Sequence, residues 1–240
     1  MFLLIDKPRG ITSHDVIDEV RNVTGEKRVG HAGTLDPNAT GLLIVGVGRE
    51  STKKLGEIAG KRKTYEAEIV LGVERTTDDV EGEIVNRSRN QVGASHRAKS
   101  ERDDKTAMKS IPVLSNIESA LESFTGEQEQ VPPVYSAIKL KGRKAYELAR
   151  RGKKPELQPR KVHIYSIELL SYKFPKLEIR TDVSSGTYIR ALTRDIGREL
   201  GTGAYLNNLN RTKIGNFSVD DAVKLKELND NNWKNYLINI

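Results

Sequence analysis

The densest group of residues that could do chemistry lies at positions 30–41, which carry the letters GHAGTLDPNATG. This glycine-rich stretch presents one carboxylate, Asp36, followed directly by a proline. An ionised carboxylate in such a loop can act as a nucleophile or stabilise a positive charge. The alternative is structural, because an Asp-Pro pair often only starts a turn. A phosphate-binding loop fits less well, since the spacing matches neither GxxxxGK[ST] nor GxGxxG.

The elements expected around this loop would hold it between a helix and a strand. The apolar run 2–5 predicts a strand, and Ser13 can cap a helix that Gly25 ends. Residues 28–41 are expected to form a loop, and the apolar run 42–47 predicts a buried strand.

The rest of the chain mixes strands and helices. Alternation of apolar and polar residues over 65–71 predicts a strand buried on one face. A capping box at Ser115 predicts a helix that ends before Gly126. Further on, the pattern predicts paired strands at 162–170 and 177–183 and a helix at 188–200. Without regular βαβ alternation or an internal repeat, this order indicates an α+β fold.

The polar, charged segment from residue 86 to 111 interrupts this order. It has too few apolar side chains to offset the entropy lost on ordering, so we expect a mobile insertion.

Composition narrows the class of protein. The net charge of +7 and the pI near 9.4 favour a polyanionic partner, although charge alone does not decide it. Zero cysteines and four scattered histidines predict that there is no metal cofactor. No apolar run is long enough for a bilayer and the start does not resemble a signal peptide, so we expect a cytoplasmic protein without a membrane partner.

The stretch 30–41 resembles the active-site loop of the TruB family of tRNA pseudouridine synthases. Four more regions are similar to that family's motifs and follow in the family's order. They are residues 6–15, residues 63–82, residues 130–150 and residues 183–190.

The resemblance implies isomerisation of a uridine to pseudouridine, at position 55 in the TΨC arm of tRNA. The N-glycosidic bond breaks, the base turns, and a carbon–carbon bond forms to the same sugar. No electron is gained or lost, so no cofactor is expected. Asp36 would be the catalytic carboxylate, and it could add to the sugar, stabilise an oxocarbenium ion, or attack the base.

The same resemblance gives roles to three further residues. Arg190 would pair with the catalytic aspartate and keep it ionised. Tyr65 would stack on the flipped base and handle the C2′ proton. His31 would contact RNA beside the extruded base and replace part of the lost stacking. The structural alternatives are a surface arginine, a core tyrosine and a loop histidine bonded to nearby backbone.

Asp79 and Lys139 match substrate-binding positions of the family, with a turn aspartate and a surface lysine as the alternatives. Lys139 is also the first residue of a basic segment, residues 139–161, which contains ten Lys or Arg residues and only two Glu residues. Lys141 and Lys144 belong to this segment, and we expect the segment to contact tRNA phosphates.

The resemblance also implies the pseudouridine-synthase fold, a mixed and largely antiparallel sheet with flanking helices and a central RNA-binding cleft. Residues 1–217 would form the catalytic domain. Residues 218–240 would be a short C-terminal segment, leaving no room for a full RNA-binding module of the PUA type. We expect a monomer without an obligate protein partner.

Two other functions fit some of these observations. An RNA-binding or RNA-folding module would need the basic segment but not Asp36, Tyr65 and Arg190 together. A glycosidase or nucleosidase would need a second carboxylate at a suitable distance, and only Asp36 lies in a convincing loop.

Overall fold

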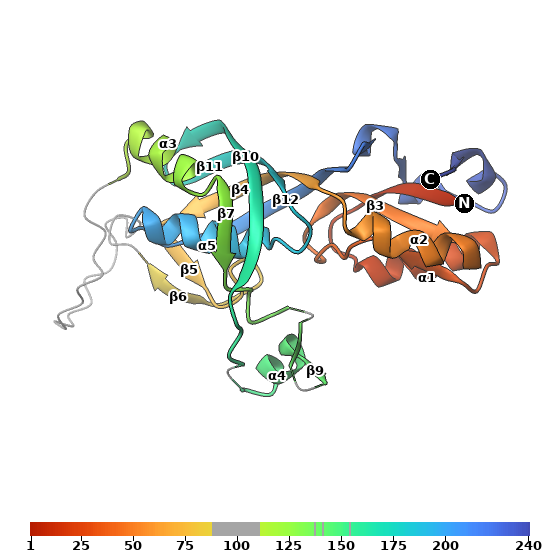
Figure 1. Ribbon diagram of the computed structural model, residues 1–240, viewed down its shortest axis with the longest axis horizontal. Helices are drawn as coiled ribbons and strands as arrows, with labels where there is room; N and C mark the ends of the chain where they lie inside the picture. Colours follow the sequence, from red (N-terminus) through yellow and green to blue (C-terminus); the bar gives the residue numbers. More distant parts are fainter. Residues whose placement is uncertain (88–110, 137, 141, 154) are drawn as a thin grey trace. The chain divides into compact units, whose positions relative to one another are not determined.

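The computed structural model describes residues 1–240 except 88–110, 137, 141 and 154 (Figure 1). The chain divides into two compact units. Unit 1 contains Met1–Glu66, Thr181–Ser185 and Asn208–Ile240, and unit 2 contains Ala67–Arg180 and Gly186–Asn207. Strands β4, β11 and β12 contribute residues to both units.

The helices are α1 (Ser13–Thr24), α2 (Arg49–Ala59), α3 (Leu114–Ser123), α4 (Ala145–Arg150) and α5 (Ile189–Glu199), with short 3-10 turns η2 (Val219–Asp221), η3 (Leu225–Glu227) and η4 (Trp233–Tyr236). The strands are β1 (Phe2–Lys7), β2 (Val29–His31), β3 (Thr40–Val47), β4 (Lys63–Leu71), β5 (Val73–Arg75), β6 (Ile84–Arg87), β7 (Gly126–Gln130), β8 (Lys139–Leu140), β9 (Arg143–Lys144), β10 (Arg160–Lys173), β11 (Lys176–Val183), β12 (Ala204–Ile214), β13 (Phe217–Ser218), β14 (Val223–Lys224) and β15 (Leu237–Ile238).

Hydrogen-bonded pairing links the strands of the main sheet in the order β14-β1-β3-β12-β4-β11-β10-β7. Strand β1 runs antiparallel to β3 and parallel to β14, whereas β12 runs parallel to β3 and β10 antiparallel to β7. The fold is therefore α+β with a large mixed sheet, as the sequence pattern and the resemblance predicted. The central RNA-binding cleft that the resemblance implies stays a prediction.

In unit 1, strands β1 and β3 are buried on both faces. Leu3 and Ile5 pack with α1, whereas Phe2 and Leu4 pack with Ile58 of α2. Because successive side chains of a strand point to opposite faces, the two helices cover opposite sides of this pair of strands. Burial on both faces explains why β1 and β3 are continuous apolar runs rather than alternating ones.

The C-terminal residues complete unit 1. Val223 of β14 lies beside Ile5, and Ile238 of β15 lies beside Phe2, so both strands flank β1 and the two termini lie close together (Figure 1). Trp233 packs against the same apolar cluster as α1. The division into a catalytic domain of residues 1–217 and a C-terminal segment without a full PUA module stays a prediction.

In unit 2, amphipathic helices cover the strands. Helix α3 buries Ile117, Ala120 and Leu121 at helical spacing and contacts β10. Helix α5 buries Ile189, Leu192 and Ile196, together with Arg190 and Thr193. The buried arginine on this helix is the first sign of a built polar site, because a buried guanidinium needs partners.

Most elements that the sequence predicted are present, with two errors at helix starts. The cap of α1 is Thr12 rather than Ser13, and Thr12 and Asp15 form a reciprocal capping box. The capping box expected at Ser115 is wrong, because α3 begins at Leu114 after Val113, which makes no side-chain cap. Gly25 does end α1, with a φ of 72°.

Several elements were not expected, among them β2 and α2. Residues 28–41 were expected to be loop throughout, but Val29–His31 form β2 because they pair with β3. Helix α2 follows β3 directly. The expected insertion at 86–111 lies outside the described residues except at its ends, where Asn86 and Arg87 belong to β6.

Candidate active site

The loop that carries Asp36 joins β2 to β3 in unit 1. Asp36 is half-buried between the buried Leu35 and a proline, and its backbone carbonyl accepts a hydrogen bond from the N–H of Ala39 at 3.0 Å. The N–H of Ala32 donates to Ile44 of β3 at 2.9 Å. The loop is therefore anchored to the sheet before Asp36 and turned directly after it.

Ser13 fixes the residue before Asp36. Its hydroxyl accepts from the N–H of Leu35 at 2.8 Å and donates to the carbonyl of Leu35 at 3.0 Å. One side chain at the start of α1 thus satisfies both backbone groups of Leu35. Since both groups are buried, losing that hydroxyl would leave them without partners.

Lys7 and Gly10 fix the residue after Asp36. The carbonyl of Pro37 accepts from the N–H of Gly10 at 2.8 Å and from Nζ of Lys7 at 3.2 Å. Lys7 is fully buried and also donates to the carbonyls of Pro8 and Ile11. Burial lowers the pKa of Lys7 to about 8, and the charge of Asp36 opposes this shift. A buried cation therefore stands close to the candidate nucleophile.

Arg211 of β12 bonds to backbone carbonyls on both sides of Asp36 in the sequence. Its Nη2 donates to the carbonyl of Gly33 at 3.0 Å, and its Nε donates to the carbonyl of Leu42 at 2.8 Å. The side chain is only 1% exposed. Burial and the charge of Arg211 lower the pKa of Lys63 to about 8. The loop is held by residues 7–13 and by Arg211, which lie far apart in sequence, and this preorganises the carboxylate.

Tyr65 and His31 lie in the same unit. Tyr65 is buried on β4, on the face that also carries Lys63 and Ala67. His31 is half-buried, and burial lowers its pKa, with smaller contributions from Arg211 and His14. Its buried Nδ1 has no hydrogen-bond partner among the described residues. At neutral pH the imidazole is uncharged and offers polar contact rather than charge to a ligand.

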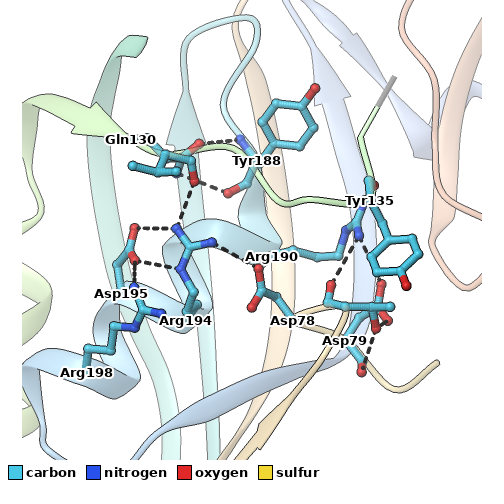
Figure 2. Close-up of polar contacts among 11 residues, drawn as sticks. Asp78, Asp79, Gln130, Tyr135, Tyr188, Arg190, Arg194, Asp195 and Arg198 are labelled. Atoms are coloured by element: carbon cyan, nitrogen blue, oxygen red, sulfur yellow. Dashed lines mark hydrogen bonds and ion pairs between the residues drawn. The ribbon is translucent and has the colours of Figure 1, made fainter. Parts of the chain in front are cut away.

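Arg190 lies in unit 2, on the first turn of α5 (Figure 2). Its Nη1 is 3.5 Å from a carboxylate oxygen of Asp79 and 3.2 Å from the carbonyl oxygen of Thr77, to which it donates. Its Nη2 donates to the carbonyl of Tyr135 at 3.0 Å. The predicted pairing of Arg190 with Asp36 stays a prediction, because Asp36 belongs to unit 1.

The carboxylate of Asp79 is also fixed by hydrogen bonds. Its carboxylate accepts from the hydroxyl of Thr77 at 2.5 Å and from the N–H of Glu81 at 3.0 Å. The structure thus places Asp79 as a partner of Arg190, and its predicted contact with substrate stays a prediction.

The predicted basic segment is described in part. Lys139 is exposed on β8, and Nζ of Lys144 on β9 lies 5.5 Å from the ring centre of Tyr146. Lys141 lies outside the described residues. In unit 2, Lys139 and Lys144 lie opposite each other on the paired strands β8 and β9, a pairing that was not predicted.

Sequence reasoning missed the groups that hold these residues. Lys7 is a buried cation at the end of the apolar strand β1, and Arg211 is a buried cation at an inward position of the alternating strand β12. Gln130 was also missed. Its side-chain amide exchanges two hydrogen bonds with the backbone of Tyr188, at 2.8 and 3.1 Å, and so fixes the start of α5. A lone cation or amide at an inward strand position is the signal that could have found them.

No group of three or more His, Cys, Asp or Glu suited to holding a metal occurs among the described residues. None of the helices in the described parts of the chain has the length and apolar character that crossing a bilayer requires.

Comparison with known proteins finds pseudouridine synthases among the proteins that this chain resembles. Residues 21–189 match the N-terminal domain of TruB family pseudouridylate synthases, and residues 190–239 match the tRNA pseudouridylate synthase B C-terminal domain. The tRNA pseudouridine synthase B of Mycobacterium sp. (strain KMS) is 43% identical over 232 residues, or 95% of this chain and 71% of the relative. That of Clostridium acetobutylicum is 42% identical over 238 residues, or 99% of this chain and 75% of the relative.

Solved structures agree with the sequence relatives. A Cbf5-Nop10-Gar1 complex contains a chain with a TM-score of 0.67 and 26% identity, matched over 97% of this chain and 55% of that one. An H/ACA RNP bound to a substrate RNA containing 2′-deoxyuridine gives a TM-score of 0.66 and 25% identity, over 99% of this chain and 56% of that one. This chain thus spans about half the length of those two.

Proposed function

This chain belongs to the TruB family of pseudouridylate synthases, and from that membership we propose that it isomerises uridine 55 in the TΨC arm of tRNA to pseudouridine. The matched sequence relatives bear the name tRNA pseudouridine synthase B. The observation that carries the proposal is the Asp36 loop, whose backbone is fixed on both sides of the carboxylate by Ser13 and Lys7 and spanned by Arg211.

The reaction rearranges bonds within one nucleotide. The bond between C1′ and N1 breaks, the base turns, and C1′ bonds to C5. C5 loses its proton and N1 gains one, so the product is an isomer of the substrate and no oxidant is needed. A uridine inside a stacked arm cannot present these atoms, so the base must first be flipped out.

Asp36 supplies the carboxylate that the bond-breaking step needs. The carboxylate can add to the sugar, stabilise an oxocarbenium ion, or attack the base. All three routes require it to be ionised and correctly placed. The buried cation Lys7 lies close to Asp36, and the hydrogen bonds to Leu35 and Pro37 restrict where Asp36 can lie.

The remaining site residues take the roles that the family resemblance implies. Tyr65 stacks on the flipped base and handles the C2′ proton, and Arg190 pairs with the catalytic carboxylate. His31 contacts RNA beside the extruded base as an uncharged group, which agrees with its lowered pKa. Asp79 and Lys139 contact the substrate, and the basic segment binds phosphates of the arm.

The test compares the parent protein with Asp36→Asn on a tRNA transcript that carries uridine 55 and on one that carries cytidine there. Asp36→Asn keeps the shape of the side chain but removes its charge, so we expect no pseudouridine and nearly parental tRNA affinity. Asp230→Asn, which changes an exposed carboxylate, is the matched control and should keep parental turnover.

The outcomes separate the alternatives. Undiminished turnover by Asp36→Asn would refute the role of Asp36. A parent protein that binds tRNA but forms no pseudouridine would instead be an RNA-binding module, and release of free uracil would indicate a nucleosidase.

A further inference from the structure

Two arginines of α5 lie one helical turn apart and face the same side of the helix (Figure 2). Arg190 and Arg194 are separated by four positions, the spacing that makes helical side chains neighbours. Their side chains are 8% and 12% exposed. Two guanidinium groups this deeply buried need anionic partners, because an uncompensated buried charge is strongly destabilising.

The partners that come from outside α5 are two carboxylates that are consecutive in sequence, and Arg194 also pairs with its helix neighbour Asp195 at 2.9 Å. Arg194 Nη1 lies 3.0 Å from a carboxylate oxygen of Asp78, and Arg190 Nη1 lies 3.5 Å from one of Asp79. In an extended strand, consecutive side chains point to opposite faces, so both could not reach the same helix. Asp78 has a φ of 62°, and this left-handed residue breaks the alternation.

Arg194 holds the same two segments that hold Arg190. Besides Asp78, it donates from Nη2 to the carbonyl of Val131 at 2.8 Å. Arg190 donates to the carbonyls of Thr77 and Tyr135. Apart from Asp195 on α5 itself, Arg194 therefore contacts residues 78 and 131, and Arg190 contacts 77, 79 and 135. A shift of either segment displaces partners of both arginines.

We propose that the Arg194–Asp78 ion pair is a positioning pair that sets the place of Arg190 and Asp79 for catalysis. It acts through the backbone of residues 77–79 and 131–135 rather than by contact with the flipped uridine. The inference rests on the proposed function, in which Arg190 serves the reaction. Burial raises the pKa of Asp78 while Arg194 and Arg190 oppose this, which agrees with a desolvated pair whose members depend on each other.

A merely structural role would predict something different. Loss of a structural ion pair lowers thermal stability, but it leaves the rate of the folded protein and the environment of Arg190 unchanged. A positioning role predicts a slower chemical step with little change in tRNA affinity, because supporting groups of a site commonly affect activity by about 10–100-fold when removed.

The main variant is Asp78→Asn, since asparagine tolerates a positive φ and keeps the shape while losing the charge. We expect its single-turnover rate of pseudouridine formation to fall by about 10–100-fold, with the dissociation constant for tRNA within about 2-fold of the parent. Arg198→Gln is the matched control, because Arg198 lies one turn further along α5, is 64% exposed, and pairs only loosely with Asp195 at 3.8 Å. It should keep the parental rate.

Variants at Arg194 test the pair from its other member. Arg194→Gln should slow the chemical step at least as much as Asp78→Asn, because it also removes the bonds of Arg194 to Val131 and Asp195. The double variant should be no slower than Arg194→Gln, because the Asp78 change then breaks no further interaction of the pair. Arg194→Lys keeps the charge but cannot reach Asp78 and Val131 together, so it should recover part of the lost rate.

A spectroscopic measurement makes the test independent of activity. The side-chain Nε–Hε signal of Arg190, recorded by NMR in the protein without RNA, should shift in Asp78→Asn and stay in place in Arg198→Gln. A folded Asp78→Asn protein with a parental rate, an unmoved Arg190 signal or a large loss of tRNA affinity overturns the positioning role. If the parent makes no pseudouridine, the proposed function fails, and the Arg190 signal alone still decides whether the pair positions it.

Discussion

At the scale of single residues, Lys7 shows how a buried charge can serve a neighbouring loop. It has no exposed surface and donates to the carbonyls of Pro8, Ile11 and Pro37. A lysine is rarely buried in this way unless its ammonium group is fully bonded. Here the three carbonyls belong to the turn before α1 and to the Asp36 loop, so Lys7 ties these two segments together.

Replacing Lys7 with methionine should lower the free energy of unfolding at pH 7 by about 2–4 kcal/mol, because the carbonyls of Pro8, Ile11 and Pro37 lose a charged donor. Lys53→Met, which removes an exposed lysine paired with Glu50, should change it by less than about 0.5 kcal/mol. Denaturant unfolding of the two variants and the parent measures the difference.

The pH dependence of stability gives a second prediction for Lys7. Its pKa in the folded protein is about 8, below the ordinary value of 10.5, so between these pH values the unfolded chain binds more protons than the folded one. Stability from this group therefore rises as the pH increases from about 8 to 10.5, and it is lost as the pH falls through about 8. The advantage of the parent over Lys7→Met should grow across this interval in unfolding measured at several pH values, and equal slopes would contradict it.

At the scale of elements, the close approach of β12 to β3 is what brings Arg211 to the Asp36 loop. The two strands pair in parallel at Thr40 and Gly41. Gly41 has a φ of 97°, and a Cβ placed there would collide with the carbonyl oxygen of Arg211. Only glycine fits both the backbone conformation and the close approach of β12.

Gly41→Ala should therefore destabilise the protein by about 2–4 kcal/mol, the sum of left-handed strain and overpacking. Gly48→Ala is the matched control, because Gly48 has a φ of 85° but open space around its Cβ position. It should lose only about 1–2 kcal/mol, from strain alone. Thermal or denaturant unfolding compares them, and similar losses in both would show that β12 has room to retreat.

Element boundaries were predicted less well than the elements themselves. The sequence pattern placed the strand at 65–71 correctly, since alternation is a local property of the chain. It missed β2, whose three residues become a strand only by pairing with β3. It also placed the cap of α1 one residue late, because Ser13 is bonded to Leu35 instead.

At the scale of the whole molecule, the positive charge is concentrated in the basic segment 139–161. Changing four of its lysines to glutamine should weaken tRNA binding and flatten its salt dependence, by about 0.7–0.9 log–log units for each phosphate that the variant no longer neutralises. The lysines are Lys141, Lys144, Lys153 and Lys154. At saturating RNA the conversion rate should stay near that of the parent, because lysines bound to phosphates position the arm without touching the flipped base.

Two controls accompany this measurement of affinity against salt. An equal number of exposed lysines in unit 1, changed to glutamine, should alter affinity less; they are Lys53, Lys54, Lys226 and Lys234. Deleting residues 88–105 should also alter it less, since charges of both signs alternate there. If the variant with four changed lysines in the basic segment keeps parental affinity while the deletion loses binding, the RNA-facing surface lies in the insertion.

The sequence by itself determined the family and the candidate carboxylate. Asp36 was found because the GHAGTLDP letters and the other motifs are runs of adjacent residues, which one chain displays without any folding. The tertiary structure alone decided what holds that carboxylate in place. Lys7 reaches Pro37 across 30 positions, Ser13 reaches Leu35 across 22, and Arg211 reaches Gly33 across 178. Such partners are selected by burial, since a desolvated carbonyl or guanidinium must be bonded by whatever group the packing brings next to it, however distant in the chain.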